Sequence, residues 1–221
     1  MELINLFSTP IWKTKIDPAS YDKDKLIQDI THNYELEPSR NRWDDISNLH
    51  HYYNDWNNDK FKKLDLSLLL KQYDSIILKF MTNFNFAKKI NYSFTFENIT
   101  AYKTSQNMNE HDHMPIETNT STVGIFSCIH YINFKEGHES TSFMNPLIAS
   151  AYSLTLSDMR NIVGNNDINL SSYFNVWKID VEEDDFIIFP SYLKHGVNKT
   201  PPTDDLRICG VSNIYLEKGK I

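Results

Sequence analysis

The spacing of apolar residues changes near residue 90, and this change separates two kinds of predicted structure. Before residue 90, apolar residues recur every three or four positions in two segments, which is the period of an amphipathic helix. The first segment spans residues 21–36 and the second spans residues 59–84. A short strand with a proline-marked break is predicted ahead of them, within residues 4–16. The apolar positions are Leu26, Ile27, Ile30 and Tyr34 in the first helix, and Leu64, Leu68, Leu69, Ile76, Ile77 and Phe80 in the second.

From residue 90 onward the pattern is that of short strands. Residues 92–104 (YSFTFENITAYKT) alternate at period two, and residues 120–134 (TSTVGIFSCIHYINF) form a β-rich, mostly apolar run. Turn-forming stretches such as KEGHES and VGNND separate these runs from the next ones. Many short strands without a long helix between them predict an antiparallel sandwich or barrel. The remaining apolar runs are residues 174–181, 185–197 and 206–217.

Length and composition narrow the class of protein. With 221 residues, of which 40% are hydrophobic, the chain is long enough for one large domain with a substantial core. We predict a single domain over residues 1–221, in which residues 1–89 support a β core formed by residues 90–221. The net charge of −7 argues against a nucleic-acid partner, because proteins that bind nucleic acids normally carry a basic face.

The sequence also bears on the compartment. It has no stretch of 18 apolar residues, and its first 16 residues lack the basic and apolar regions of a signal peptide. We therefore predict a cytoplasmic protein without a membrane span. Cys128 and Cys209 lie in apolar runs without metal-binding or redox spacing, so we expect two small buried side chains and no disulfide.

The stretch NEHDHMP, residues 109–115, is the first candidate for chemistry. On a strand, residues two apart point to the same side, so His111 and His113 would face one way and Asp112 the other. Two imidazoles placed in this way can chelate one cation. The pattern alone is weak evidence for a metal site, because a carboxylate–histidine acid/base pair or a polar loop could have the same sequence. A third ligand from elsewhere in the chain would favour a metal site.

A candidate third ligand lies in residues 185–197, DFIIFPSYLKHGV. A buried strand ends there in a Pro-Ser turn, and a second strand delivers His195. Twelve residues later, Arg207 begins another apolar strand. An arginine that enters a β core normally has an anionic partner, because an unpaired buried guanidinium is very costly. The partner could be a ligand, or an ion pair could form with Asp204, Asp205 or Glu97.

Taken together, these residues resemble the Fe(II)/2-oxoglutarate-dependent oxygenases, whose cupin-like fold is a double-stranded β-helix, or jelly roll. In that family a histidine, a second ligand two residues later and a distal histidine bind iron, and a following arginine holds the co-substrate. The motifs LFSTPIW, FPSYLKHGV and RICGVSN most resemble a phage and marine-bacterial subgroup. The resemblance implies metal binding by His111, His113 and His195, and 2-oxoglutarate binding by Arg207, Tyr131 and Tyr102.

One departure from the family matters. Most members use His-x-Asp or His-x-Glu, whereas the second position here is His113. Asp112 could ligate only if a bulge turned it inward, so we favour His113. Imidazoles bind Fe(II), Zn(II), Cu and Ni alike, so the ligands do not decide which metal is bound.

The resemblance implies a reaction. The protein would use O₂ to oxidise an unknown small molecule, protein or peptide and would release succinate and CO₂. Hydroxylation is the default outcome. A phage-encoded protein would act in the host cytoplasm.

Two other functions remain. The first is a non-redox, cupin-like metal-binding protein, in which Arg207 would be paired internally. The second is a non-catalytic, phage-type interaction module that uses the aromatic stretch at 43–56 as its contact surface. We expect residues 39–58 and 135–175 to line the substrate pocket. His130 and His138 are predicted to lie outside the site. For His50 and His51 a metal role stays open, and we favour a surface or packing role.

Overall fold

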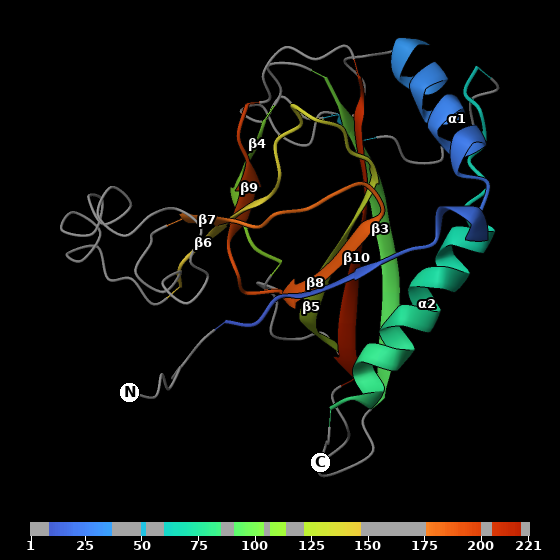
Figure 1. The fold of residues 1–221 in the computed structure, drawn as a ribbon. Coiled ribbons are helices and arrows are strands. Elements are labelled where there is room, and N and C mark those ends of the chain that lie inside the picture. Colours follow the sequence, from blue (N-terminus) through green and yellow to red (C-terminus); the bar gives the residue numbers. More distant parts are fainter. Residues whose placement is uncertain are drawn as a thin grey trace.

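The architecture is that of two antiparallel sheets packed face to face, with helices on the outer face of the larger sheet (Figure 1). This computed structural model describes the chain in eight ranges. The predicted mainly β fold with N-terminal helices is confirmed. The ranges are 9–36, 50–51, 60–84, 91–103, 107–113, 122–146, 176–199 and 205–217.

The larger sheet contains six of the described strands. In order across the sheet they are β1 (Trp12–Lys15), β8 (Asp185–Pro190), β5 (Thr122–Asn133), β10 (Arg207–Glu217), β3 (Tyr92–Tyr102) and β2 (His50–His51). Both edge strands, β1 and β2, come from the N-terminal part of the chain, so residues 1–89 extend the sheet as well as covering it. The division between residues 89 and 90 stays a prediction.

The smaller sheet contains four of the described strands and carries the site described below. Their order is β4 (Met108–His111), β9 (His195–Val197), β6 (Ser142–Met144) and β7 (Val176–Lys178). All four are short. β9 is held between β4 and β6, and Figure 1 shows this sheet on the side of the larger sheet that faces away from the helices.

The two predicted helices are present, but the second starts later than its pattern suggested. α1 spans Lys23–Leu36, close to the predicted 21–36, whereas α2 spans Ser67–Thr82 instead of 59–84. The Asp65 carboxylate accepts a hydrogen bond from the backbone N–H of Ser67, which satisfies one of the unpaired donors at the helix start. A short 3₁₀ turn, Pro18–Ser20, precedes α1.

The apolar stripe of α2 also differs from the predicted one. Leu68 is 49% exposed, and Leu64 is buried but precedes the helix. A helix packed on a sheet buries one face only, and Leu68 lies about 100° around the axis from the buried Leu69. The stripe that packs on the sheet repeats at steps of four, four and three. It consists of Leu69, Tyr73, Ile77 and Phe80.

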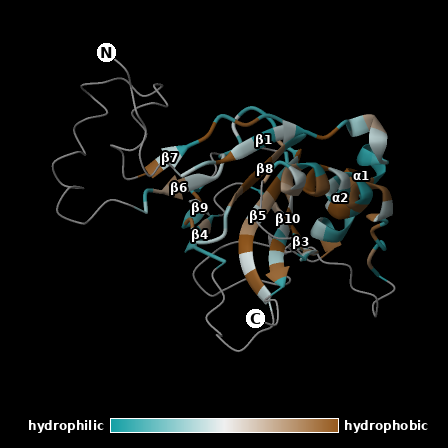
Figure 2. Cartoon of the chain, turned by 90° about the horizontal axis from the view of Figure 1, so that it is seen from below, coloured by the Kyte–Doolittle hydropathy of each residue, from teal (hydrophilic) through white to brown (hydrophobic). Residues whose placement is uncertain are grey.

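Two cores hold the layers together. The first lies between the helices and the larger sheet, where Trp12 of β1 packs edge-on to Phe80 of α2, with ring centroids 4.9 Å apart. The second lies between the sheets and includes Phe143 and Phe189, whose centroids are 5.0 Å apart. Figure 2 shows hydrophobic residues gathered along β5, β8 and β10 and on the helices beside them.

Both cysteines lie in these cores. Cys128 and Cys209 are buried and carry free thiols, as the sequence predicted. Burial raises the pKa of each thiol, which favours the neutral form of a small hydrophobic side chain. In the described ranges, no helix has the length and hydropathy that crossing a membrane requires.

Candidate metal centre

The first and third histidines are placed by the pairing of β4 with β9. His111 lies directly opposite His195 in this antiparallel register. The pairing requires a glycine next to His195, because a Cβ on Gly196 would lie 2.9 Å from the carbonyl oxygen of Met108. The turn before β9 closes with a hydrogen bond of 2.9 Å from the N–H of Leu193 to the carbonyl of Pro190. The sequence FPSYLKHGV thus turns a buried strand back to the edge of β4.

His113 lies two residues beyond the end of β4, so strand alternation alone does not place it. Its backbone N–H donates to the carbonyl of Ser191 at 2.9 Å, which ties this loop to the turn after β8. Its ring stacks on that of His195, with centroids 5.2 Å apart and planes 10° from parallel. A backbone tether therefore brings the second predicted ligand to the other two.

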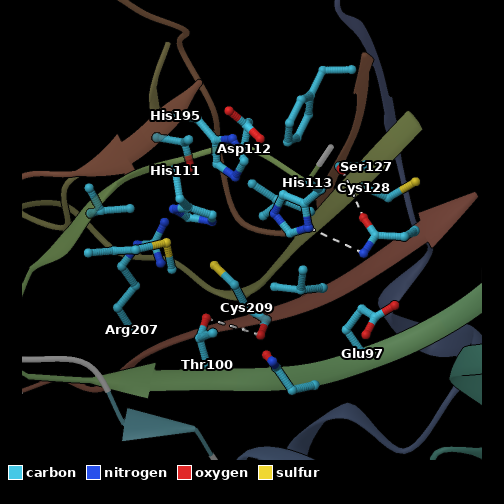
Figure 3. A pocket seen from close by; sticks show the side chains of 18 residues that line it. Glu97, Thr100, His111, Asp112, His113, Ser127, Cys128, His195, Arg207 and Cys209 are labelled. Atoms are coloured by element: carbon cyan, nitrogen blue, oxygen red, sulfur yellow. Dashed lines mark hydrogen bonds between the residues drawn. The ribbon is translucent and has the colours of Figure 1, made fainter. Parts of the chain in front are cut away.

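The three imidazoles form one cluster (Figure 3). The ring centroid of His111 is 4.3 Å from that of His195 and 5.1 Å from that of His113. One nitrogen of each ring lies within 4.8 Å of the others, a separation that one metal ion can bridge. The intervening Asp112 is exposed, and its carboxylate does not belong to this group. The geometry favours His113 over Asp112 as the second ligand.

Backbone carbonyls fix the orientation of two of these rings. Nδ1 of His111 lies 2.9 Å from the carbonyl oxygen of Asn109, and Nδ1 of His195 lies 2.9 Å from that of Leu193. A carbonyl only accepts, so each Nδ1 carries the proton and each Nε2 carries the lone pair. This arrangement is the usual one for histidines that bind a metal through Nε2.

Burial keeps two of the imidazoles neutral. Desolvation, aided by the nearby His111, lowers the pKa of His113 to about 4 and that of His195 to about 3. A metal binds only the neutral form of an imidazole. At neutral pH these two rings are therefore ready to ligate without first losing a proton.

A buried polar network supports His113. Its Nδ1 lies 3.2 Å from the side-chain nitrogen of Asn213, whose Oδ1 accepts from Ser127 Oγ at 2.8 Å. Ser127 Oγ is in turn 3.2 Å from Ser191 Oγ. The carbonyl of Ser191 also accepts from the backbone N–H of His113. Hydrogen bonds from this network therefore position both the main chain and the ring of His113.

The amide of Asn213 has two orientations of equal shape. With the nitrogen towards His113, Nδ1 of the ring accepts a hydrogen bond. After a half-turn, Oδ1 accepts from Nδ1–H of His113 and the amide nitrogen donates to Ser127, whose hydroxyl can accept as well as donate. Binding of a metal at Nε2 of His113 requires the proton on Nδ1, so it would select the second orientation.

Arg207 begins β10, as predicted, and is 2% exposed. Its Nε donates to the carbonyl of Glu139 at 2.9 Å. Its guanidinium carbon lies 4.8 Å from the ring centroid of Tyr102 and 5.4 Å from that of Tyr131. No carboxylate in the described ranges forms an ion pair with it.

Two of the three carboxylates considered as ion-pair partners of Arg207 do not pair with it. Glu97 and Asp205 are both described, and neither pairs with the guanidinium. Asp204 lies outside the described residues. Arg207 therefore brings a buried positive charge to the wall of the cavity beside the histidines.

The two tyrosines predicted to bind 2-oxoglutarate pack against Arg207 and do not line the cavity themselves. The hydroxyl of Tyr102 is buried and has no hydrogen-bond partner in the described part of the chain. The hydroxyl of Tyr131 donates to Thr141 Oγ1 at 2.8 Å, and Thr141 lines the cavity. Burial raises the pKa of Tyr131 to about 12 and raises that of Tyr102 further, so both hydroxyls keep their protons.

The cavity has a volume of about 270 Å³ and lies between the two sheets (Figure 3). The three histidines and Arg207 line it together, which brings four of the six predicted site residues to one space. Sequence reasoning missed several polar side chains in its wall. Four of them are polar residues within strands β3, β5 and β10, and Thr141 follows a polar stretch just before β6. The missed residues are Glu97, Asn98, Thr141, Ser127 and Asn213.

His130 and His138 do not line the cavity, as predicted. His130 faces the helices, where its Nδ1 is 2.9 Å from the hydroxyl of Tyr73. The ring of His138 contacts the N–H of Lys135 and the carbonyl of Asp205. His50 and His51 form β2, the edge strand that pairs with Ala101 and Thr100 of β3. Apart from these two, the predicted pocket segment 39–58 lies outside the described residues, as does most of 135–175.

Solved structures of 2-oxoglutarate oxygenases share this fold over nearly the whole chain. A viral collagen prolyl hydroxylase from Paramecium bursaria Chlorella virus-1, in complex with 2-oxoglutarate, matches with a TM-score of 0.51 and 13% identity, covering 93% of this chain and 95% of that one. A prolyl-4-hydroxylase from Pseudomonas putida matches with a TM-score of 0.52 and 9% identity, covering 96% and 94%.

The likeness extends beyond prolyl hydroxylases. The non-heme α-ketoglutarate-dependent carbocyclase SnoK from nogalamycin biosynthesis matches with a TM-score of 0.54 and 12% identity, covering 95% of this chain and 80% of that one. No family model and no curated protein matches the sequence. At these identities the likeness shows the fold, and the predicted double-stranded β-helix is confirmed.

Proposed function

We propose that this protein is an Fe(II)- and 2-oxoglutarate-dependent dioxygenase that hydroxylates a substrate still to be identified. One observation carries the proposal: a cluster of three histidines shares a cavity with a buried arginine that has no described anionic partner. A metal alone would explain the histidines. The arginine adds a requirement for a carboxylate ligand in the same space.

The residues present fit a metal. His111, His113 and His195 would hold it, and three protein ligands leave room for a chelating co-substrate in an octahedral site. All three ligands are neutral, so the ion would keep its full charge of +2. A dianionic co-substrate would then balance this charge, and we expect metal and 2-oxoglutarate to strengthen each other's binding.

The residues present also fit 2-oxoglutarate. Arg207 would pair with its distal carboxylate in a bidentate, charge-assisted contact, which a lysine cannot reproduce. Tyr102 lies against the guanidinium and not in the cavity wall, so its part would be to position Arg207. Tyr131 would act through Thr141, since its own hydroxyl is already used there.

Iron and 2-oxoglutarate, when bound, would supply the oxidising chemistry: O₂ and 2-oxoglutarate are consumed, succinate and CO₂ leave, and one oxygen atom enters the substrate as a hydroxyl. The chain's own part is to position and to shield. Phe189 packs edge-on to His195 with centroids 4.8 Å apart, and with Val197 it forms an apolar wall that limits water near the cluster.

The test is an anaerobic titration of the metal-free protein with Fe(II) and then 2-oxoglutarate, followed by visible absorption. We expect a weak charge-transfer band only when both are present, because the band reports chelation of the metal by the co-substrate. Succinate release in air would then be the assay for substrates. If Fe(II) or 2-oxoglutarate does not bind, the proposal is wrong.

One observation favours a second candidate. The cluster contains no carboxylate, and three imidazoles suit Zn(II) or Ni(II) as well as Fe(II). A non-redox, cupin-like metal protein would bind metal in the same titration without developing the band.

The narrower expectations remain predictions. A non-catalytic interaction module would hold no metal at all, and its proposed contact surface at 43–56 is described only at residues 50–51. The phage-type subgroup and the cytoplasmic location also stay predictions.

A further inference from the structure

The cavity wall contains a β-bulge that turns two neighbouring side chains the same way. In the pairing of β3 with β10, Asn98 lies opposite Val211 and Phe96 lies opposite Ser212, so Glu97 is an extra residue. On a regular strand, Glu97 and Asn98 would point to opposite faces. Here both line the cavity, and bulges beside active sites commonly re-aim side chains in this way.

The side-chain oxygens of Glu97 and Asn98 accept hydrogen bonds, and few donors in the described ranges reach them. Oε1 of Glu97 accepts from the hydroxyl of Tyr215 at 3.1 Å, and no cation in the described ranges pairs with the carboxylate. Oδ1 of Asn98 is buried and has no described partner. A buried acceptor without a donor is costly, so a donor from outside the chain would be bound favourably.

This end of the cavity is distinct from the end at Arg207. Arg207 pairs with Tyr102 and Val211 pairs with Asn98, so four ladder positions separate the two ends. At roughly 3.3 Å per residue, that is about 13 Å along the strands. Figure 3 shows Arg207 and Glu97 on opposite sides of the cavity, with the three histidines along its upper side. A carboxylate ligand at Arg207 therefore leaves Glu97 and Asn98 to another molecule.

We propose that Glu97 and Asn98 bind a cationic nitrogen group of the substrate, an ammonium or a guanidinium. This inference rests on the proposed function, in which 2-oxoglutarate occupies the Arg207 end. Ammonium and guanidinium groups carry only donors and match a surface of acceptors. Charge-assisted hydrogen bonds to the carboxylate would hold the group, and its neighbouring C–H bonds would face the metal site. The substrate class is thus an amine, or a lysine- or arginine-like side chain.

The test uses three matched probes: the N-acetyl amides of lysine, arginine and norleucine. Norleucine keeps the apolar stem but has no charge. Binding to the ¹⁵N-labelled full chain is followed by NMR titration, both with Ni(II) and 2-oxoglutarate present and without them. We expect the lysine or arginine probe to bind about tenfold more tightly than the norleucine probe, as a hydrogen-bonded charge would give.

Three variants locate the effect. Glu97→Gln removes the charge but keeps an acceptor for Tyr215, and should reduce the preference to about twofold or less. Asn98→Asp adds a carboxylate of the same shape and should increase the preference several-fold. Glu217→Gln is the matched control, since this exposed carboxylate lies on the same sheet outside the cavity and its loss should change nothing.

The outcomes separate this inference from the proposed function. Equal binding of all three probes would overturn the inference while leaving Ni(II) and 2-oxoglutarate binding intact. An equal loss of preference in Glu97→Gln and Glu217→Gln would also overturn it, because the effect would then be general electrostatics. A preserved preference for cations in a protein that binds neither Ni(II) nor 2-oxoglutarate would support the cation site and overturn the dioxygenase.

Discussion

The imidazoles of His111 and His195 face each other across the β4–β9 ladder, with ring centroids 4.3 Å apart. Two residues 84 positions apart in sequence are thus brought together by strand register, and a slip of one residue would turn one ring to the opposite face. The close approach at Gly196 helps to fix that register. The site therefore depends on the pairing of two short strands.

Replacing His195 by alanine should abolish metal binding while the fold persists. We expect the affinity for Co(II) or Zn(II) to fall by more than about 100-fold, since even a residue that only supports a ligand is worth about 10–100-fold. Isothermal titration gives the affinity, and circular dichroism checks the fold. His32→Ala, at an exposed position on α1, is the control. Unchanged metal affinity in His195→Ala would remove this residue from the site.

Separate alanine variants of His113 and Asp112 should identify the second ligand. We expect His113→Ala to lose the metal and Asp112→Ala to keep its affinity within about threefold, because the exposed carboxylate lies outside the cluster. Equilibrium dialysis followed by metal analysis measures retention. The reverse result would mean that Asp112 turns inward when metal binds.

Asn213 should affect the metal affinity, because its side chain decides which nitrogen of His113 carries the proton. Asn213→Asp offers only acceptors, so it fixes the proton on Nδ1 of His113 and should keep or raise metal affinity. Asn213→Leu removes the partner and should lower the affinity by about 10–100-fold. The ¹⁵N shifts of the imidazole in the metal-free variants report the tautomer directly. Equal affinities in both variants would show that Asn213 does not orient the ring.

Changes at Arg207 should separate co-substrate binding from metal binding. We expect Arg207→Ala to weaken 2-oxoglutarate binding by about 10–100-fold, the effect of losing hydrogen bonds to a charged group, with little change in metal affinity. Arg207→Lys should recover only part of the loss because it lacks the planar fork. Titration of the metal-loaded variants with 2-oxoglutarate measures both. An unchanged 2-oxoglutarate affinity would mean that the guanidinium is paired within the chain.

His130 should make folding stability depend on pH. Burial, and to a smaller extent Lys23, lowers its pKa to about 3, whereas an unfolded histidine titrates near 6.5. Between these values the unfolded state binds a proton that the native state does not, so stability falls as the pH drops from about 6.5 towards 3. His130 contributes a slope of about 1.4 kcal/mol per pH unit in that window.

Urea unfolding at pH 7, 6 and 5 tests this prediction. His130→Gln is expected to be less stable at pH 7, since it loses its bond to Tyr73, but its stability should fall less steeply on acidification. His32→Gln, at an exposed position on α1, is the control for the substitution itself. Parallel slopes in all three proteins would show that another group dominates the acid response.

The spacing of apolar residues predicted the layers well, because a helix or strand that buries one face carries apolar residues at the period of that element. It was less reliable at helix ends: α2 begins at Ser67, beside the Asp65 carboxylate, and the apolar Leu64 stays outside the helix. For the site, the H-x-H spacing found two histidines, although a tether to Ser191 and not a strand places the second. Asn213 and Glu97 could not be found, because strand register and a bulge decide which way they point.

Strand β1 pairs with β8, and Trp12 lies opposite Ile188, 176 residues further along the chain. During synthesis at roughly 5–20 residues per second, the first strand would wait about 9–35 s before its neighbour leaves the ribosome. A strand without its partner is exposed to wrong pairing during that interval. The yield of folded protein should therefore respond to the rate of translation and to chaperones that shelter the unpaired β1.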